Sequence, residues 1–344
     1  MRAALALASV LQSEHSVDDA VFGIHETVAL SGEVNNIDVE YSTTRFPMSP
    51  KFILELNRAI RMHKPDIVHC LGLYTCMVAT FIRQFRCFRL VSTVHRVNPR
   101  VRFRMFVRLV APIIAKHTDQ LTFLTEYQRD FYDMRFGYRS DMSVVLPNVV
   151  LLGNGPAADR SEYIKDGFRI VFVGRLVASK NVETFIDTVR ILISRGCKVS
   201  GIIVGGGDYQ YVRSLHAYAG EMVGRGIEFV GYRTDPEVYI DCADVILFPT
   251  KTEALPNLIV ESFARGKAVV CSNIPQLREI CNNGNSILVD GYNANDYADK
   301  VAKLMSNTLY RQGIENRARE TYKTVFETSL VANKYMKVYE DVLK

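Results

Sequence analysis

The chain has 344 residues, of which 48% are hydrophobic and 23% are charged. This length favours two domains, because a single hydrophobic core rarely grows beyond about 250 to 300 residues. The ordinary composition excludes a disordered, collagen-like or coiled-coil protein, and the net charge of +5 is too small to indicate a partner by itself.

Seven cysteines are present, and they form neither a CxxC pair nor a metal-binding spacing. Most lie in apolar stretches, which is typical of buried thiols in a reducing compartment. The longest apolar run, Leu109 to Ala115, falls far short of the roughly 18 to 20 residues of a membrane-spanning helix. The apolar start of the chain, Ala3 to Leu11, ends at polar residues without a cleavage-like region. We interpret it as a buried first β-strand of a cytoplasmic protein.

Short apolar runs alternate with helical patterns in the first part of the chain, as in parallel sheets with helical crossovers. The expected strands after the first run are Asp66–Cys70, Leu90–His95, Gln120–Leu124 and Ser143–Leu146. Phe52, Leu56 and Ile60 recur at helical spacing, which predicts a helix between Pro50 and His63. A turn-rich segment over residues 151–167 is typical of a linker.

A second series of alternating elements follows the linker. Its expected strands are Phe168–Val173, Val199–Val204, Ile227–Val230, Asp244–Phe248, Ala268–Cys271 and Ser286–Val289, and its expected helices are Asn181–Ser194, Asn257–Ala264 and several between Ala294 and Leu343. The sequence therefore predicts an α/β protein with two doubly wound, Rossmann-like domains that face a cleft, and a helical C-terminal tail. The expected domains are 1–150 and 168–325, with a C-terminal helix at 326–344 that can cross back to the first domain.

Two acidic residues mark the segment Thr252 to Gly266, a loop and helix that follow an apolar strand. The free amides of such a helix start favour anion binding. Glu253 precedes the helix, and Glu261 lies within it beside apolar Leu258 and Ile259. A carboxylate in such surroundings needs a partner, and paired sugar hydroxyls suit it. A solvated helix glutamate is the alternative interpretation.

Two cations surround an earlier strand-to-helix turn. Arg175 lies in the turn after Gly174, and Lys180 lies just before the next helix. Together they suit a diphosphate, since Arg offers a fork of donors and Lys a point charge. The alternative is an ordinary solvated loop, in which both residues are common.

The glycine run Gly205–Gly207 resembles a dinucleotide-binding loop only superficially, because Gln210 occupies the last glycine position of that fingerprint. We expect these glycines to allow a tight turn and the close approach of a ligand. The sequence also lacks the P-loop, HExxH and GxSxG motifs and any Asp-x-Asp metal motif, so metal and catalytic-triad mechanisms have no motif to support them.

Two histidines, His69 and His95, are expected at the carboxyl ends of strands in the first domain, where α/β sheets bind ligands. A single histidine at a strand end is usually structural, and a second one at the same sheet edge favours function.

The segment between Asp66 and Asp119 contains nine Arg or Lys and no acidic residue. Within it, one helical face carries Phe103, Phe106, Val107 and Val110, and another carries Arg100, Arg104 and Arg108. This pattern is typical of a helix that lies on an anionic membrane surface. An amphipathic helix packed on its own domain is the alternative.

Together these motifs resemble the retaining glycosyltransferases of family 4, which have the GT-B fold. Gly174-Arg175-Leu176 with Lys180 resembles the diphosphate-binding loop of that family, and Glu253 to Glu261 resembles its E-x7-E motif. The resemblance is strong over about residues 168 to 290. It implies a donor domain at 168–325 and an acceptor-side domain at 1–150.

The resemblance also implies residue roles. Arg175 and Lys180 would neutralise the leaving diphosphate, Glu261 would hold the ribose hydroxyls, and Glu253 would bind the donor sugar. His95 would face the reacting carbon. The remaining donor contacts would come from Leu258, Ile259, Gly206 and the stretch Phe229 to Tyr232, which would line the base pocket.

These observations predict a metal-independent hexosyltransferase without a cofactor, whose donor is a UDP- or GDP-linked sugar. Its acceptor would be a saccharide, expected to be lipid-linked, in cell-surface polysaccharide or lipopolysaccharide synthesis at the inner face of a membrane; nucleic acid is not an expected partner. One alternative is a nucleotide-sugar 2-epimerase of the same fold. Another is a non-catalytic subunit that binds the nucleotide sugar.

Overall fold

A computed structural model describes residues 2–15, 17–18, 20–23, 37–44, 49–94, 104–137, 143–153, 167–282 and 284–344. The chain forms two compact units. Unit 1 comprises Met1–Leu151 together with Phe326–Lys344, and unit 2 comprises Leu152–Val325.

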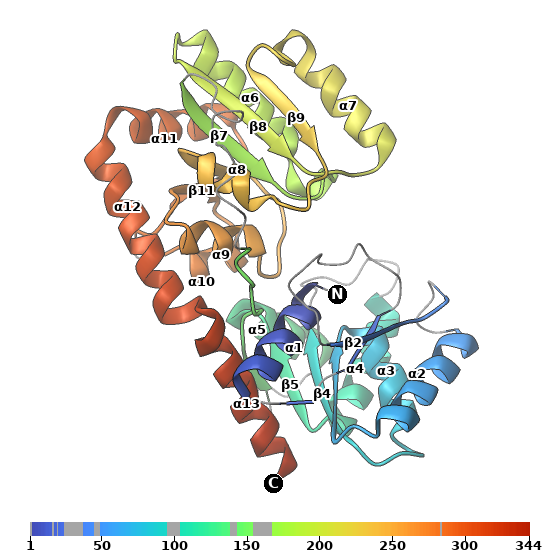
Figure 1. Cartoon of the computed structure of the whole chain (residues 1–344). Coiled ribbons are helices and arrows are strands. Elements are labelled where there is room, and N and C mark those ends of the chain that lie inside the picture. Colours follow the sequence, from blue (N-terminus) through green and yellow to red (C-terminus); the bar gives the residue numbers. More distant parts are fainter. Residues whose placement is uncertain are drawn as a thin grey trace. The chain divides into compact units, whose positions relative to one another are not determined.

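Unit 1 contains a parallel sheet whose strand order follows the chain. Its strands are β3 (Ile67–Leu71), β4 (Arg89–Val94), β5 (Gln120–Phe123) and β6 (Ser143–Val145), and a separate parallel pair is formed by β1 (Ala20–Gly23) and β2 (Asp38–Tyr41). The helices that alternate with them are α2 (Pro50–His63), α3 (Leu73–Ile82), α4 (Arg104–His117) and α5 (Glu126–Phe136), each in contact with the next (Figure 1). The expected strands between residues 66 and 146 and the helix at 50–63 are confirmed.

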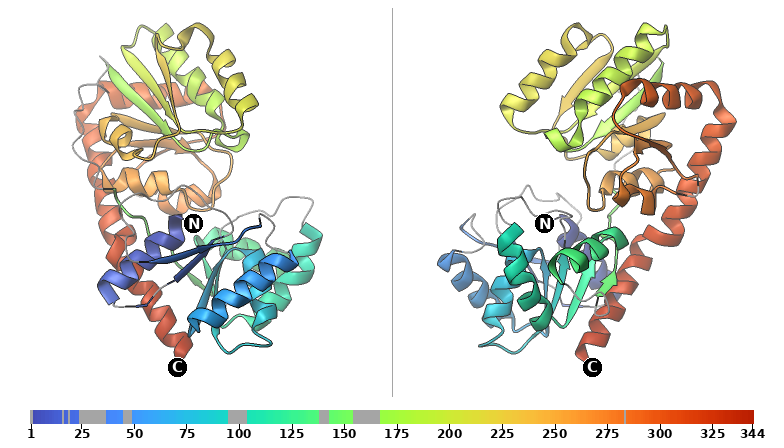
Figure 2. Two further views of the ribbon diagram at one scale, coloured as in Figure 1. Left: turned by 45° about the vertical axis from the view of Figure 1, so that its right-hand side comes forward. Right: turned by 180° about the vertical axis from the view of Figure 1, so that it is seen from behind.

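The first apolar run is a helix, α1 (Arg2–His15), and the prediction of a buried first strand was wrong. The run consists mainly of Ala and Leu, which are strong helix formers, and a short apolar run does not by itself distinguish a buried strand from a buried helix. Leu7 and Leu11 of α1 share a buried cluster with Tyr335 of α13 (Thr328–Leu343), and Figure 2 shows the two helices side by side.

Unit 2 contains a six-stranded parallel sheet with the order β12-β11-β10-β7-β8-β9. The strands are β7 (Phe168–Val173), β8 (Val199–Val204), β9 (Ile227–Gly231), β10 (Val245–Phe248), β11 (Val269–Ser272) and β12 (Ile287–Val289), all at or within two residues of the expected positions. β8 and β9 follow on one side of β7. The chain then returns to the other side of β7, where it adds β10, β11 and β12 in turn. The pair β7 and β10 therefore forms the topological switch point, where open α/β sheets bind ligands at their carboxyl edge.

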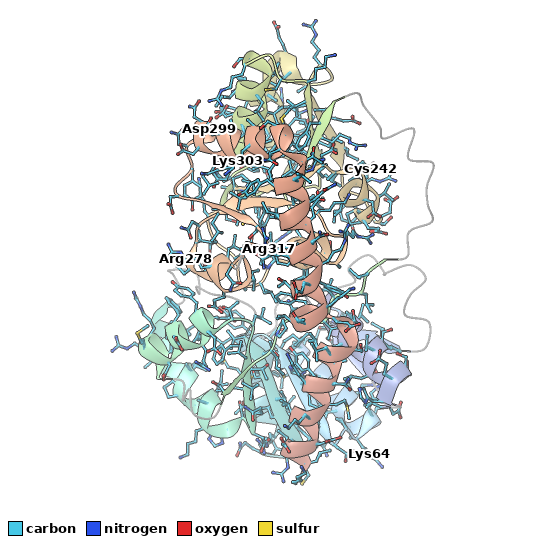
Figure 3. The ribbon with its side chains drawn as sticks, turned by 90° about the vertical axis from the view of Figure 1, so that its left-hand side faces the viewer. Lys64, Cys242, Arg278, Asp299, Lys303 and Arg317 are labelled. Carbon is cyan, nitrogen blue, oxygen red and sulfur yellow. The ribbon has the colours of Figure 1, made fainter. Side chains whose placement is uncertain are left out.

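Helices connect these strands and form the tail. They are α6 (Val182–Ser194), α7 (Tyr209–Ala219), α8 (Glu237–Cys242), α9 (Asn257–Ala264), α10 (Pro275–Ile280), α11 (Ala294–Ser306) and α12 (Thr308–Thr321). Figure 3 shows Asp299 on α11 and Arg317 on α12. Asp299 accepts from Arg195 at the end of α6 over 2.6 Å, and Arg317 donates to the Gly284 carbonyl over 2.9 Å. These bonds secure the first two helices of the tail to the body of unit 2.

Five of the cysteines are buried, while Cys87 is exposed and Cys197 is half-buried. This agrees with the expectation that most of the thiols lie in the core. Among the described residues, no helix combines the length and apolar character needed to span a bilayer.

Candidate active site

Two loops of unit 2 carry the predicted site residues, and both leave the sheet at its switch point. The first follows β7 and contains Arg175, a short 3-10 turn (Ala178–Lys180) and the start of α6. The second follows β10 and contains Glu253 before α9. Because β7 and β10 are hydrogen-bonded neighbours with parallel direction, both loops emerge at the same sheet edge.

The structure brings Lys180 and Glu253 together in an ion pair between Nζ and Oε1. Both side chains are largely buried, with 15% and 11% of their surface exposed. The ammonium also lies 4.9 Å from the centre of the buried Phe248 ring, which attracts a cation through its π-face. Glu253 is thus held in place by Lys180 and is largely shielded from solvent.

Thr250 links the two loops. It is fully buried, and its hydroxyl lies 2.9 Å from Oε1 of Glu253 and 3.1 Å from the carbonyl oxygen of Ser179. The amide of Lys251 also donates to the Ser179 carbonyl, over 2.8 Å. The loop that holds Lys180 is therefore fixed to the loop that holds Glu253 by side-chain and backbone hydrogen bonds.

The glycine run after β8 packs against the backbone of the Arg175 loop. A Cβ at Gly205 would lie 1.8 Å from the carbonyl oxygen of Gly174, and one at Gly207 would lie 2.1 Å from that of Leu176. The amide of Leu176 donates to the Gly206 carbonyl over 2.8 Å. We expected these glycines to admit a ligand, but the close approach at Gly205 and Gly207 is made by the chain itself.

The other predicted donor residues of unit 2 lie around these loops. Arg175 is exposed. Glu261 lies on α9, eight residues after Glu253, and is half-buried. No side chain caps α9, so its first amides are not engaged by a capping group. Leu258 is buried with 6% of its surface exposed. Ile259 is fully buried and its amide donates to the carbonyl of Pro256, and its contact with a ligand stays a prediction.

The predicted base-pocket stretch lies at the end of β9. Phe229 stacks on His216 of α7 with ring centres 4.0 Å apart, and Tyr232 is 57% exposed. A Cβ at Gly206 would lie 3.4 Å from the Cβ of Tyr232, so these two predicted residues are neighbours.

In unit 1, His95 lies outside the described residues, and its role stays a prediction. His69 lies within β3 and not at its end. Its Nε2 is 2.6 Å from the Thr93 hydroxyl and its Nδ1 is 2.6 Å from the hydroxyl of Tyr339 on α13. The expectation that His69 ends its strand was wrong: Nε2 contacts the neighbouring strand β4, and Nδ1 attaches the C-terminal helix to the sheet.

The predicted basic helix is α4. Its apolar face was expected to lie on a membrane surface, but the described part of that face packs into unit 1. Val107 is buried in the unit 1 core, and Val110 packs against that core. Phe103 and Arg100 lie outside the described residues, as do the side chains of Arg104 and Phe106. Arg108 is exposed as expected. Val107 and Val110 therefore follow the alternative interpretation of a helix packed on its domain.

Comparison with known proteins identifies both units. Residues 5–152 match the family model described as Glycosyltransferase Family 4, and residues 167–307 match the one described as Glycosyl transferases group 1. Both units thus carry glycosyltransferase domains. The capsular polysaccharide biosynthesis glycosyltransferase CapM of Staphylococcus aureus is 22% identical over 209 residues, which cover 60% of this chain and 55% of CapM.

A second relative is the N,N'-diacetylbacillosaminyl-diphospho-undecaprenol alpha-1,3-N-acetylgalactosaminyltransferase of Campylobacter jejuni, 24% identical over 51% of this chain and 45% of its own. The chain therefore spans about half the length of these curated relatives. Among solved structures, Anabaena Alr3699/HepE in complex with UDP and glucose superposes with a TM-score of 0.84 at 18% identity, over 98% of this chain and 95% of that one. This similarity establishes the GT-B fold, with two Rossmann-like domains and a helical C-terminal region.

Two residues of the candidate site, Thr250 and Phe248, were not predicted from the sequence. A usable signal exists for Thr250, since a hydroxyl two residues beyond the end of a core strand lies at the ligand-binding edge of the sheet. Phe248 gave no such signal, because an aromatic residue at the end of an apolar strand is ordinarily a core residue.

Proposed function

We propose that this chain is a retaining glycosyltransferase that transfers a hexose from a UDP- or GDP-linked sugar to a lipid-linked saccharide acceptor in cell-surface polysaccharide or lipopolysaccharide synthesis. The observation that carries the proposal is the buried pairing of Lys180 with Glu253 at the switch point of unit 2. The relatives support it, since CapM is named for capsular polysaccharide biosynthesis and the Campylobacter enzyme for a diphospho-undecaprenol substrate.

The proposed chemistry follows from the charges. The bond between the anomeric carbon and the diphosphate oxygen breaks, so negative charge develops on the leaving diphosphate. Arg175, Lys180 and the uncapped start of α9 are positive groups that stabilise this charge. Such stabilisation accelerates the reaction because it is stronger in the transition state than in the bound substrate. In this proposal cationic side chains take the role that a metal ion has in other transferases.

The remaining residues bind and orient. Glu253 accepts from hydroxyls of the donor sugar and Glu261 from those of the ribose, while Phe229 and Tyr232 lie beside the base. The acceptor hydroxyl forms the new bond to the anomeric carbon and gives its proton to the leaving diphosphate oxygen. Retention of configuration and the proximity of His95 to the reacting carbon rest on the family resemblance.

The test is a screen of UDP- and GDP-linked hexoses for thermal stabilisation, because a ligand that binds only the folded protein raises its melting temperature. The proposal expects one of them to stabilise the chain, and nucleotide to be released only after a saccharide acceptor is added. Release without an acceptor would instead support the 2-epimerase. Binding without turnover toward any acceptor would support a non-catalytic subunit.

We also propose that unit 1 attaches to anionic lipid through the outer face of α4. Leu109 and Ile113 point away from the core with 68% and 54% of their surface exposed, and exposed Arg108 and Lys116 flank them. Apolar side chains bordered by cations suit the boundary between headgroups and acyl chains. The sequence between Asp66 and Asp119 contains no acidic residue, which also favours contact between this face of α4 and anionic lipid.

Vesicle co-sedimentation tests this attachment. Changing Arg108 and Lys116 to Gln is expected to weaken binding to phosphatidylglycerol vesicles and to remove its salt sensitivity, and Leu109→Gln is expected to weaken it further. Leu309→Gln, at a leucine of unit 2 that is 81% exposed, is the matched control and should change nothing. Equal binding to neutral phosphatidylcholine vesicles would contradict the proposal.

A further inference from the structure

We propose that Thr250 is a positioning residue that fixes one oxygen of Glu253 and thereby leaves the other, Oε2, as the single acceptor for a hydroxyl of the donor sugar. This inference rests on the proposed function. It adds a residue to the site and states which atom of the carboxylate meets the ligand.

The Thr250 hydroxyl has one proton and three acceptors near it. These are the carbonyl of Ser179 at 3.1 Å, that of Thr252 at 3.4 Å and Oε1 of Glu253 at 2.9 Å. Hydrogen bonds to an ionised carboxylate are shorter and stronger than those to a neutral carbonyl. The Ser179 carbonyl already receives the amide of Lys251. The proton is therefore best placed on Oε1.

Two internal donors meet at this oxygen. Lys180 Nζ and the Thr250 hydroxyl both contact Oε1 of Glu253, from two different loops. Within the described part of the chain, no group donates to Oε2. A carboxylate held at one oxygen in this way keeps a defined orientation, and only its second oxygen can accept from a ligand.

Thr250 is itself firmly held. It is fully buried, and its carbonyl accepts from the hydroxyl of Ser272 at the end of β11. Because Thr250 is buried, bulk water cannot replace its hydroxyl in a variant that lacks it. Glu253 would therefore lose one of its two internal hydrogen-bond donors. The expected result is a carboxylate that rotates around its remaining bond to Lys180.

The experiment compares the affinity for a nucleoside diphosphate with that for the same nucleotide carrying its sugar. Calorimetric titrations use UDP against UDP-glucose and GDP against GDP-mannose, with the full chain. For the pair that binds, Thr250→Val is expected to weaken sugar-nucleotide binding about 10-fold or more, the scale of one hydrogen bond to a charged group, while the affinity for the bare diphosphate changes less than about 2-fold. Thr250→Ser keeps the hydroxyl and is expected to restore wild-type affinity.

A matched control separates positioning from folding. Thr188→Val removes another fully buried hydroxyl of unit 2, one that donates to the Thr184 carbonyl within α6 over 2.7 Å, and it should leave both affinities unchanged. Thr250→Ala is the second variant without a hydroxyl, should Thr250→Val fail to fold. Equal weakening of both ligands, or a Thr250→Ser variant as weak as Thr250→Val, would overturn the inference alone. A wild-type chain that binds none of the four ligands would overturn the proposed function as well.

Discussion

The backbone contact between the glycine run and the Arg175 loop makes a measurable prediction for Gly205→Ala. Gly205 has a φ of +147°, which L-residues rarely adopt, and an added Cβ would lie 1.8 Å from the Gly174 carbonyl oxygen. The substitution must therefore strain the backbone and also separate two loops. Separation breaks the bonds from the Gly174 amide to Val204 and from the Gly205 amide to Gly231, of 3.0 and 2.8 Å.

Two further glycines separate the two costs. Gly196 has a φ of +79° with nothing within 4 Å of an added Cβ, so Gly196→Ala carries only the backbone strain, about 1–2 kcal/mol. Gly207→Ala carries only the collision, at 2.1 Å from the Leu176 carbonyl oxygen. Gly205→Ala carries the strain and two hydrogen bonds of about 1 kcal/mol each, together about 3–4 kcal/mol. For a unit of this size, about 2–4 °C of melting temperature corresponds to 1 kcal/mol.

Differential scanning calorimetry of the three variants measures these differences. We expect Gly205→Ala to lower the melting temperature of unit 2 by about 6–16 °C, and Gly196→Ala by about 2–8 °C. Gly207→Ala should also lose nucleotide-diphosphate binding, because the displaced loop carries Arg175. A Gly205→Ala variant with the same melting temperature as Gly196→Ala would refute the close packing of the two loops.

Two other predictions concern charge. Arg175→Ala is expected to lower kcat at least about 10-fold, the scale of one lost charge-stabilising donor, whereas Arg213→Ala on the exposed side of α7 leaves turnover unchanged; equal turnover in both would reject the contact with the leaving diphosphate. Burial raises the pKa of Tyr335 above its ordinary value of 10, so the folded chain retains a proton that the unfolded chain loses. The stability of unit 1 should therefore fall as the pH rises above 10, and Tyr335→Phe should reduce that fall; a pH slope that Tyr335→Phe leaves intact would exclude this cause.

The strands after residue 66 were predictable because each is a short apolar run bounded by turn residues, such as the run that ends at Gly174. The first element was not, since Ala3 to Leu11 has the apolar character of a buried strand and the composition of a helix. Its identity depends on α13, which covers it from a distant part of the sequence. A pattern read along the chain contains no signal for such a partner.

The cationic and acidic residues of the site were predictable from their positions at strand ends. The pairing of Lys180 with Glu253 was not, because it depends on β7 and β10 being neighbours in the sheet. The glycines at 205 and 207 were misjudged for the same reason: their small size serves a backbone from another loop. His69 was misjudged because Tyr339, its partner, lies 270 residues further along the chain.

The division of the chain has a consequence for its biosynthesis. The core that α1 shares with Leu146 is completed by Val331 and Tyr335 of α13, which are translated only after all of unit 2. At about 5–20 residues per second, the ribosome needs roughly 10 to 35 s to cross that interval. Unit 2 is continuous in sequence and can fold during this time, whereas the nascent unit 1 exposes an apolar surface until the last helix emerges. The first half of the polypeptide is therefore the last to mature, and it is the part for which a chaperone would matter most.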